Sequence, residues 1–214
     1  MRRKIRIAVP SKGRLKQPTV DILRRSRVEI LERERVYDSE TSDSRFRVSF
    51  MRAFDVPLYV QYGAADVGFT GHDIVVERDA DVLELLDFGF GLCGLVVAVP
   101  KDSHIRTIED IADVPRVATE YPNTSRRFFA SKGKQVEILT VRGATELAPM
   151  LGLAEIIVDV STTGETLAKN NLRQVAVILE SSCRFVCNKI AYRAFEREIR
   201  ELINKLKGRE RVSS

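Results

Sequence analysis

The stretch that decides the fold runs from Glu146 to Leu167 and reads ELAPMLGLAEIIVDVSTTGETL. Its centre, residues 156–160, is a short apolar run that carries Asp159 and predicts a buried strand. A hydroxyl-rich turn with Gly164 follows, and residues 166–170 predict a helix. A strand, such a turn and a helix in this order gather backbone N–H groups and hydroxyls around one point, which is how proteins bind phosphate. We therefore expect an anion pocket here.

Outside this stretch, the pattern alternates between strands and helices. The expected strands are residues 5–10, 45–51, 67–70, 95–99, 116–119, 136–139, 175–180 and 184–188. The expected helices are residues 18–27, 58–62, 74–78, 146–150 and 191–207, with short ones opening at Thr107 and ending at Lys132. This alternation predicts an α/β protein.

The pattern also predicts two lobes with a cleft between them. The chain is expected to leave one α/β lobe near residues 95–101 and to return near residues 177–184. Lobe I would then be discontinuous, made of residues 1–95 and 181–214. Lobe II would be residues 96–180 and would carry the phosphate loop.

The composition describes a globular protein with a mild positive balance. The chain has 214 residues, of which 44% are hydrophobic and 30% charged, and its formal net charge is +5. Because the two signs are interspersed, a solvated surface is favoured over a nucleic-acid interface, and the balance suits a polyanionic small molecule. No run reaches the roughly 18 apolar residues that a membrane span needs.

Cysteine usage and the start of the chain indicate a cytoplasmic protein. The chain has three cysteines, Cys93, Cys183 and Cys187. Because their number is odd and their spacing is not that of a metal site, we expect buried, reduced thiols. The basic start, MRRK, runs directly into a predicted strand, and we expect no signal peptide. The sequence GFGLCG at residues 89–94 has the spacing of a dinucleotide motif, but it precedes a strand and not a helix, so we reject that interpretation.

Several other loops at predicted strand ends share one chemical theme. The cations are Lys12, Arg14, Arg52, Arg126 and Arg127, the glycines Gly13, Gly71, Gly143 and Gly164, and the carboxylates Asp55, Asp73, Glu120 and Asp159. No Ser-His-Asp or Cys-His arrangement accompanies them. The set favours recognition of polyphosphate and sugar over covalent catalysis.

The chain resembles the ATP phosphoribosyltransferases of histidine biosynthesis over about residues 5–190. The positions that carry the signature are Glu146, Gly152, Ala154, Ile157, Asp159, Val160, Thr163, Gly164, Thr166 and Leu167. Four further blocks resemble the family in order: residues 12–15, Arg52 with residues 55–57, residues 63–73 and residues 118–123. Five blocks in order are far more specific than an isolated T-G-x-T.

The resemblance implies a Mg²⁺-dependent transfer. Adenine N1 of ATP attacks the anomeric carbon of phosphoribosyl pyrophosphate, which gives N1-(5-phosphoribosyl)-ATP and pyrophosphate. By analogy Asp159 binds a ribose hydroxyl, and the phosphate is bound by Ser161, Thr162, Thr163, Gly164, Glu165 and Thr166. Lys12, Arg14 and Arg52 are the expected catalytic cations. The expected ATP contacts are Thr70, Gly71, Asp73 and Glu120, and Mg²⁺ is expected to be bound mainly through the substrate phosphates.

The family also implies a fold and partners. Its fold resembles type II periplasmic binding proteins, with two lobes crossed twice by the chain. We expect the short form, without the C-terminal regulatory domain, as a homodimer and in a hetero-oligomer with a regulatory subunit resembling histidyl-tRNA synthetase. Two alternatives stay open: a non-catalytic two-lobed binding module, and a phosphoribosyltransferase that takes another base.

Overall fold

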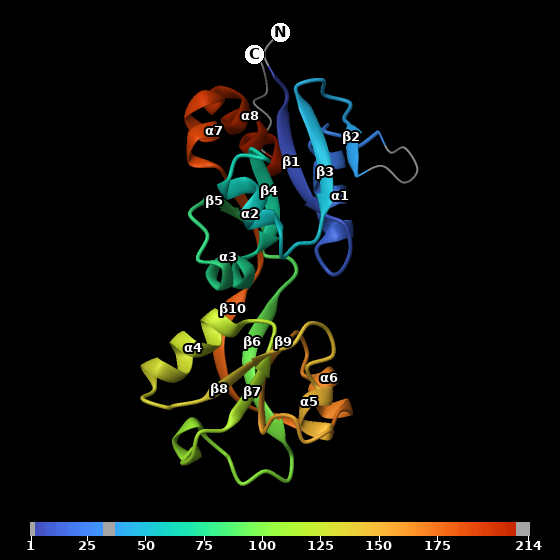
Figure 1. Cartoon of the computed structure of the whole chain (residues 1–214). Coiled ribbons are helices and arrows are strands. Elements are labelled where there is room, and N and C mark those ends of the chain that lie inside the picture. The colour runs from blue at the N-terminus through green and yellow to red at the C-terminus, as the bar shows by residue number, and fades with distance from the viewer. Residues whose placement is uncertain (1–2, 32–36, 209–214) are drawn as a thin grey trace. The chain divides into compact units, whose positions relative to one another are not determined.

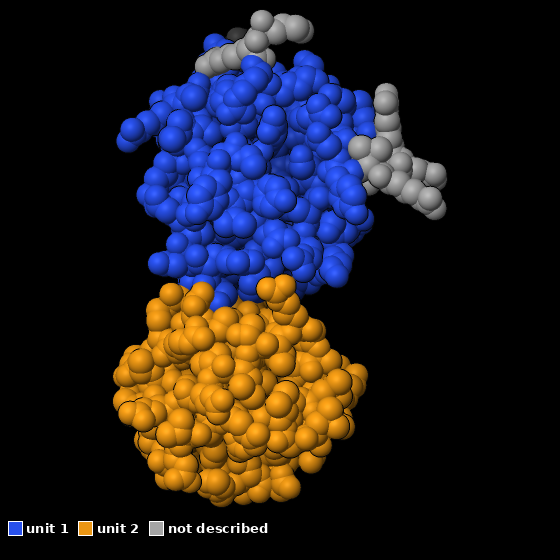
Figure 2. All heavy atoms as spheres, viewed as in Figure 1, with its two compact units in different colours: residues 1–91, 182–214 blue, residues 92–181 orange. Residues whose placement is uncertain are grey.

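The computed structural model describes residues 3–31 and 37–208 (Figure 1). The first two residues of the basic start therefore lie outside the described part. The chain divides into unit 1, Met1–Gly91 with Ser182–Ser214, and unit 2, Leu92–Ser181 (Figure 2). The boundaries expected from the sequence, after residue 95 and before residue 181, fall within β6 (Cys93–Pro100) and β10 (Leu172–Ser181).

Unit 1 contains a six-stranded sheet of order β2-β3-β1-β4-β11-β5. Its strands are β1 (Ile5–Pro10), β2 (Asp38–Glu40), β3 (Phe46–Met51), β4 (Val67–Gly71), β5 (Leu83–Asp87) and β11 (Cys183–Cys187). Strands β3, β1 and β4 are parallel, whereas β2, β11 and β5 pair antiparallel with their neighbours. The parallel strands therefore end together at one edge.

The helices of unit 1 cover both faces of this sheet. They are α1 (Lys16–Arg25), α2 (Val56–Gln61), α3 (His72–Arg78), α7 (Lys189–Ala194) and α8 (Glu196–Leu206). The connections β1→β3 and β3→β4 step in opposite directions, so right-handed crossovers place α1 and α2 on opposite faces. Two apolar clusters are consistent with this placement. Ile7 of β1 packs with Leu23 of α1 on one face, and Ala8 packs with Val56 of α2 on the other.

Unit 2 contains a five-stranded sheet of order β10-β6-β9-β7-β8. The strands not yet given are β7 (Arg116–Thr119), β8 (Glu137–Thr140) and β9 (Ile156–Ser161). Strands β9, β7 and β8 are parallel, and β6 pairs antiparallel with both β9 and β10. The carboxyl ends of β7, β8 and β9 therefore share one edge of the sheet.

The helices of unit 2 are short and lie on both sides of the sheet. They are the 3-10 helix η1 (Ile108–Asp110), α4 (Pro122–Ser131), α5 (Leu147–Met150) and α6 (Glu165–Lys169). Figure 1 shows α5 and α6 together on one side and α4 on the other. Ala148 of α5 and Leu167 of α6 pack with Ala118 and Ile157 in one buried cluster. This packing fixes the start of α6 against the end of β9.

Three features of the fold correct the expectations. Strands β2 and β5 were not expected at all. The helix expected over residues 191–207 is two helices, because Phe195 leaves the helical region with φ −126° and ψ 31°. The other expected elements are present with shifted ends; β10, for example, begins at Leu172 and not at residue 175.

The rejection of a dinucleotide motif at residues 89–94 is confirmed. No helix follows these residues, and Gly94 already lies in β6. Gly91 has φ +64°, and a Cβ there would lie 2.3 Å from Leu15 Cδ2. This glycine therefore serves close packing within unit 1.

Candidate active site

The expected phosphate loop lies at the shared carboxyl edge of β7, β8 and β9. Gly164 begins α6 with φ +77°, a conformation that a residue with a Cβ rarely adopts. Its N–H donates to Ser161 Oγ at 3.2 Å, and the Glu165 N–H reaches Thr163 Oγ1 at 3.4 Å. Two hydroxyls thus shape the turn from inside.

The same turn keeps donors available for a ligand. In residues 3–31 and 37–208, the structure assigns no acceptor to the backbone N–H groups of Thr162 and Thr163. Thr162, Thr163, Glu165 and Thr166 are exposed. N–H groups and hydroxyls arranged around a left-handed glycine form an anion-binding concavity. The loop therefore has the chemistry of a phosphate site.

Asp159 lies two residues before Ser161 and is the partly buried carboxylate of this edge. Its Oδ2 accepts a hydrogen bond from Thr145 Oγ1, and its Oδ1 accepts one from the Val160 N–H at 2.6 Å. Burial raises the pKa of Asp159; these two hydrogen bonds lower it, and the charges of Glu120 and Glu146 raise it further. A carboxylate held in this way is suited to accept hydrogen bonds from hydroxyl groups.

Glu120 follows β7 at the same edge and is tied to the next loop. Its Oε1 accepts the Gly143 N–H at 2.6 Å. The preceding residue, Thr119, donates from Oγ1 to the Val158 carbonyl at 2.7 Å. The structure thus brings together Glu120, Asp159 and the loop at residues 161–166, as the sequence predicts for residues that follow parallel strands.

Unit 1 has a second set of expected residues, at the carboxyl edge of β1, β3 and β4. Lys12 is exposed, and no hydrogen bond or ion pair is assigned to it in the described part of the chain. Arg14 donates from Nε to the Gly91 carbonyl at 3.1 Å, and its Nη2 lies 3.6 Å from Asp73 Oδ1. Gly13, between them, has φ +79°. The turn therefore presents one unpaired ammonium beside one oriented guanidinium.

Arg52 follows β3 at this edge and remains largely exposed. Its Nε donates to Asp55 Oδ2 at 3.0 Å, while the other oxygen of Asp55 lies 3.6 Å from Arg78 Nη2. An exposed pair of this kind favours one orientation of the side chain but contributes little free energy, because water screens the charges. Arg52 is therefore oriented without being buried.

Thr70 and Asp73 lie below the surface of this edge. Both side chains are fully buried, and Thr70 Oγ1 donates to the Ala53 carbonyl at 2.9 Å. Asp73 lies in the first turn of α3, whose N-cap is Gly71. The buried Asp73 has Arg14 as an ion-pair partner, a contact between residues distant in sequence that the sequence could not indicate.

The described residues show neither a protein-built metal site nor a membrane span. Within residues 3–31 and 37–208, no group of three or more His, Cys, Asp or Glu side chains is placed to hold a metal ion. Over the same residues, no helix is long and apolar enough to cross a membrane.

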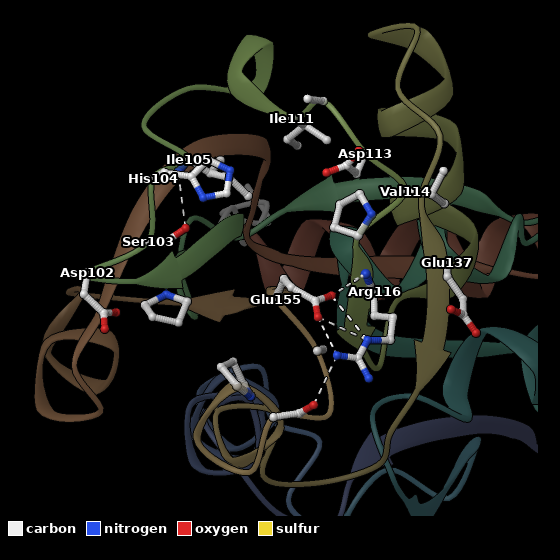
Figure 3. Close-up of a pocket in the computed structure, with 16 residues that line it drawn as sticks. Asp102, Ser103, His104, Ile105, Ile111, Asp113, Val114, Arg116, Glu137 and Glu155 are labelled. Carbon is white, nitrogen blue, oxygen red and sulfur yellow. Dashed lines mark hydrogen bonds and ion pairs between the residues drawn. The ribbon is translucent and has the colours of Figure 1, made fainter.

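A cavity of about 930 Å³ lies at the other edge of the unit 2 sheet (Figure 3). It is lined by the residues where β7 and β8 begin and by those that precede β9, with Arg116 and Glu155 paired in its wall. Because the strands are parallel, this edge is opposite the phosphate loop. None of the expected site residues lines the cavity.

Comparison with known proteins decides the family. A family model described as HisG, ATP phosphoribosyltransferase, matches residues 52–208. The chain belongs to the ATP phosphoribosyltransferase family. A protein of that name from Halothermothrix orenii is 46% identical over 166 residues, which cover 77% of this chain and 74% of the relative. One from Methanocaldococcus jannaschii is 41% identical over 204 residues, covering 94% and 70%.

Solved structures agree with the family and with the fold. A chain of the ATP phosphoribosyl transferase (HisG:HisZ) complex from Thermotoga maritima has a TM-score of 0.84 at 32% identity, with 95% of this chain and 97% of that chain covered. The alkanesulfonate-binding protein SsuA from Xanthomonas axonopodis pv. citri has a TM-score of 0.60 at 14% identity, covering 97% and 73%. The expected α/β, two-lobed fold of the type II periplasmic-binding-protein kind is confirmed.

Membership of the ATP phosphoribosyltransferase family settles the class of activity. The chain is a pentosyltransferase of the glycosyltransferase class, and its reaction is the first step of histidine biosynthesis. Sequence reasoning nevertheless missed Thr145, the donor to Asp159. Its position two residues after Gly143, in the loop that follows a parallel strand, is the signal that could have found it.

Proposed function

We propose that this ATP phosphoribosyltransferase binds the ribose 5-phosphate of phosphoribosyl pyrophosphate at the β9–α6 loop of unit 2. The observation that carries the proposal is the turn at Gly164, where Ser161 and Thr163 shape the backbone and the N–H groups of Thr162 and Thr163 have no assigned acceptor among the residues that the structure describes. The 5-phosphate is received by these N–H groups and by the hydroxyls of Thr162, Thr163 and Thr166. Asp159 accepts a hydrogen bond from a ribose hydroxyl.

The chemistry requires orientation and charge stabilisation. Adenine N1 of ATP attacks the anomeric carbon while the bond to pyrophosphate breaks, and the ribosyl centre becomes oxocarbenium-like. Cations at the departing pyrophosphate lower the barrier, because they stabilise charge that develops in the transition state. We assign this role to Lys12, Arg14 and Arg52.

The remaining expected residues are assigned to ATP. Thr70, Gly71 and Asp73 are all buried, so we propose that they support the ATP side from beneath its surface, with Asp73 acting through Arg14, which lies 3.6 Å away. Glu120 uses Oε1 for the Gly143 N–H. We assign its Oε2 to the ATP side.

Magnesium is proposed to enter the site bound to the substrates. The described residues offer no group of three carboxylate, histidine or cysteine ligands. The chain therefore does not build a metal cage of its own in that part, and we propose that Mg²⁺ binds mainly through the pyrophosphate and triphosphate oxygens. No step is assigned to it.

Partners and location belong to the same proposal. The Thermotoga maritima chain was solved in a HisG:HisZ complex. This chain is 32% identical to it. We therefore propose that this chain forms a homodimer and associates with a regulatory subunit that resembles histidyl-tRNA synthetase. Three free, buried cysteines suit a reducing compartment, which supports the cytoplasm as its location.

The test combines the purified chain with ATP, phosphoribosyl pyrophosphate and Mg²⁺, alone and with a candidate regulatory subunit. The expected result is an adduct that absorbs in the near ultraviolet, with one pyrophosphate released per adduct. Competition between ATP and free bases identifies the accepting nucleobase. Binding of both substrates without adduct formation, even with the subunit present, would overturn the proposed reaction.

A further inference from the structure

We propose that Thr145 is a positioning residue that holds Asp159 ionised and correctly oriented for the ribose. The proposal rests on the assignment of Asp159 to the phosphoribosyl site, given above. Thr145 itself touches no substrate in this scheme. It acts through the carboxylate to which it donates.

The contacts of Asp159 fix the plane of its carboxylate. Thr145 Oγ1 donates to Oδ2, and the Val160 N–H donates to Oδ1 at 2.6 Å. One donor is backbone within β9, and the other is a side chain from a different loop. Because each oxygen has its own donor, the carboxylate cannot rotate without breaking one hydrogen bond. Its remaining lone pairs then point in a defined direction.

Thr145 is in turn held firmly by its surroundings. Its side chain is fully buried, and its N–H donates to the Gly143 carbonyl at 2.8 Å. The Gly143 N–H donates to Glu120 Oε1 at 2.6 Å, which ties this loop to the end of β7. Thr119 Oγ1 donates to the Val158 carbonyl at 2.7 Å and accepts the Tyr121 N–H at 2.8 Å. The ends of β7 and β9 and the loop that carries Thr145 therefore form one hydrogen-bonded unit.

The charges around Asp159 explain why a donor is needed there. Glu120, after β7, and Glu146, before α5, both face it with negative charge, and its partner on β6 is the uncharged Val96. Burial and these two carboxylates favour the protonated acid, whereas Thr145 and the Val160 N–H favour the carboxylate. A protonated Asp159 would lose part of its capacity to accept a ribose hydroxyl. Removing only the hydroxyl of Thr145 should therefore favour the protonated form of Asp159.

The experiment measures kcat/KM for phosphoribosyl pyrophosphate against pH in the full chain with any required subunit. Thr145→Val keeps the shape of the side chain and removes the donor. We expect kcat/KM at neutral pH to fall by about tenfold or more, since a hydrogen bond to a charged group is lost. The acid limb of the profile should move to higher pH.

Two further variants make the result specific. Thr145→Ser restores the hydroxyl and should return the acid limb to its original position. Glu146→Gln removes a negative charge that faces Asp159 and should move the limb to lower pH. A merely structural role of Thr145 would lower activity at every pH alike. The phosphates of the substrate titrate identically in all assays, so a difference between variants belongs to the protein.

Asp159→Asn separates the two proposals. If it leaves kcat/KM unchanged, the assignment of Asp159 to the phosphoribosyl site is wrong. If it lowers kcat/KM but Thr145→Val leaves the acid limb in place, the positioning role of Thr145 is overturned. Should Thr145→Val fail to fold, Thr145→Cys provides a weaker donor, and an acid limb identical to that of the unmodified chain would overturn the role equally.

Discussion

Gly164 adopts a φ of +77° where the loop meets α6, and a Cβ built there meets no atom of the protein within 4 Å. The Cβ that Gly164→Val adds therefore meets no clash. The substitution strains the backbone and places methyl groups where the phosphate is proposed to approach. We expect the Kd for phosphoribosyl pyrophosphate to rise by about tenfold or more, through lost backbone access to the anion. Isothermal titration calorimetry measures this.

Gly133 provides the matched control for Gly164. It lies in the same unit, has φ +67° and likewise meets nothing within 4 Å. Gly133→Val carries a similar backbone strain at the end of α4, so it should destabilise the protein to a similar degree and leave the Kd unchanged. Equal Kd values for the two variants would contradict the proposed phosphate position.

Arg52 gives a second prediction for a single residue. Arg52→Ala should lower kcat by about tenfold to hundredfold with little change in KM, because its charge is proposed to act on the leaving pyrophosphate in the transition state. Arg78→Ala is the control, since Arg78 pairs with the same Asp55. Steady-state kinetics compare the two. An effect of Arg52→Ala on KM alone would argue against the leaving-group role.

Residue types and spacing predicted where the candidate residues of unit 2 lie better than where those of unit 1 lie. Asp159 and Ser161 lie in the last half of β9 and Gly164 follows it, so their local order is enough to place them. Burial depends on contacts distant in sequence. The sequence therefore could not show that Asp73 is fully buried or that Arg14 also binds the Gly91 carbonyl.

At the level of elements, β11 carries two buried thiols, and the pKa of each is raised. Burial raises the pKa of Cys183 and of Cys187 to about 12 each. In the unfolded chain both thiols ionise near pH 9, so above that pH the folded state binds more protons and stability falls. The two thiols together therefore lower the unfolding free energy by up to about 2.7 kcal/mol for each pH unit between pH 9 and 12.

A double variant, Cys183→Ala with Cys187→Ala, tests this contribution. Urea unfolding at pH 8, 9 and 10 should show a smaller loss of stability in the variant than in the unmodified chain. Because both thiols stay protonated near pH 8, turnover at that pH should be unaffected. Equal alkaline slopes for the two proteins would show that the thiols are more accessible to water than the structure indicates.

The elements missed in the sequence are those whose partners lie far along the chain. Strand β5 pairs with β11, about one hundred residues later, and β2 is a three-residue edge strand beside β3. Neither has a strong local pattern. The break between α7 and α8 falls at Phe195, without a nearby glycine or proline, where the ring is buried and Arg3 lies 4.8 Å from its centre. Tertiary packing, not local propensity, decides that break.

On the scale of the whole molecule, the order of the elements along the chain is enough to predict the two strands by which it passes between the units. A chain that leaves an α/β unit and later returns must cross twice, and the sequence indicates these crossings near residues 95–101 and 177–184, at the apolar runs 95–99 and 175–180. In the structure these runs are neighbours: Cys93 pairs with Ser181 and Leu172 with Pro100. Unit 2 therefore begins and ends on adjacent antiparallel strands.

This arrangement predicts that residues 92–181 fold without the rest of the chain. The segment is continuous, has its own five-stranded sheet and its own apolar cluster, and its two ends lie side by side. It also contains the whole β9–α6 loop and both donors to Asp159. We expect the isolated segment to unfold cooperatively in urea and to bind ribose 5-phosphate, with chemical-shift changes at residues 161–166. Gly164→Val in the segment should abolish those changes, whereas Gly133→Val should not. A segment that folds but gives no changes at the loop would move the phosphate site elsewhere, because nothing that forms this loop has been removed.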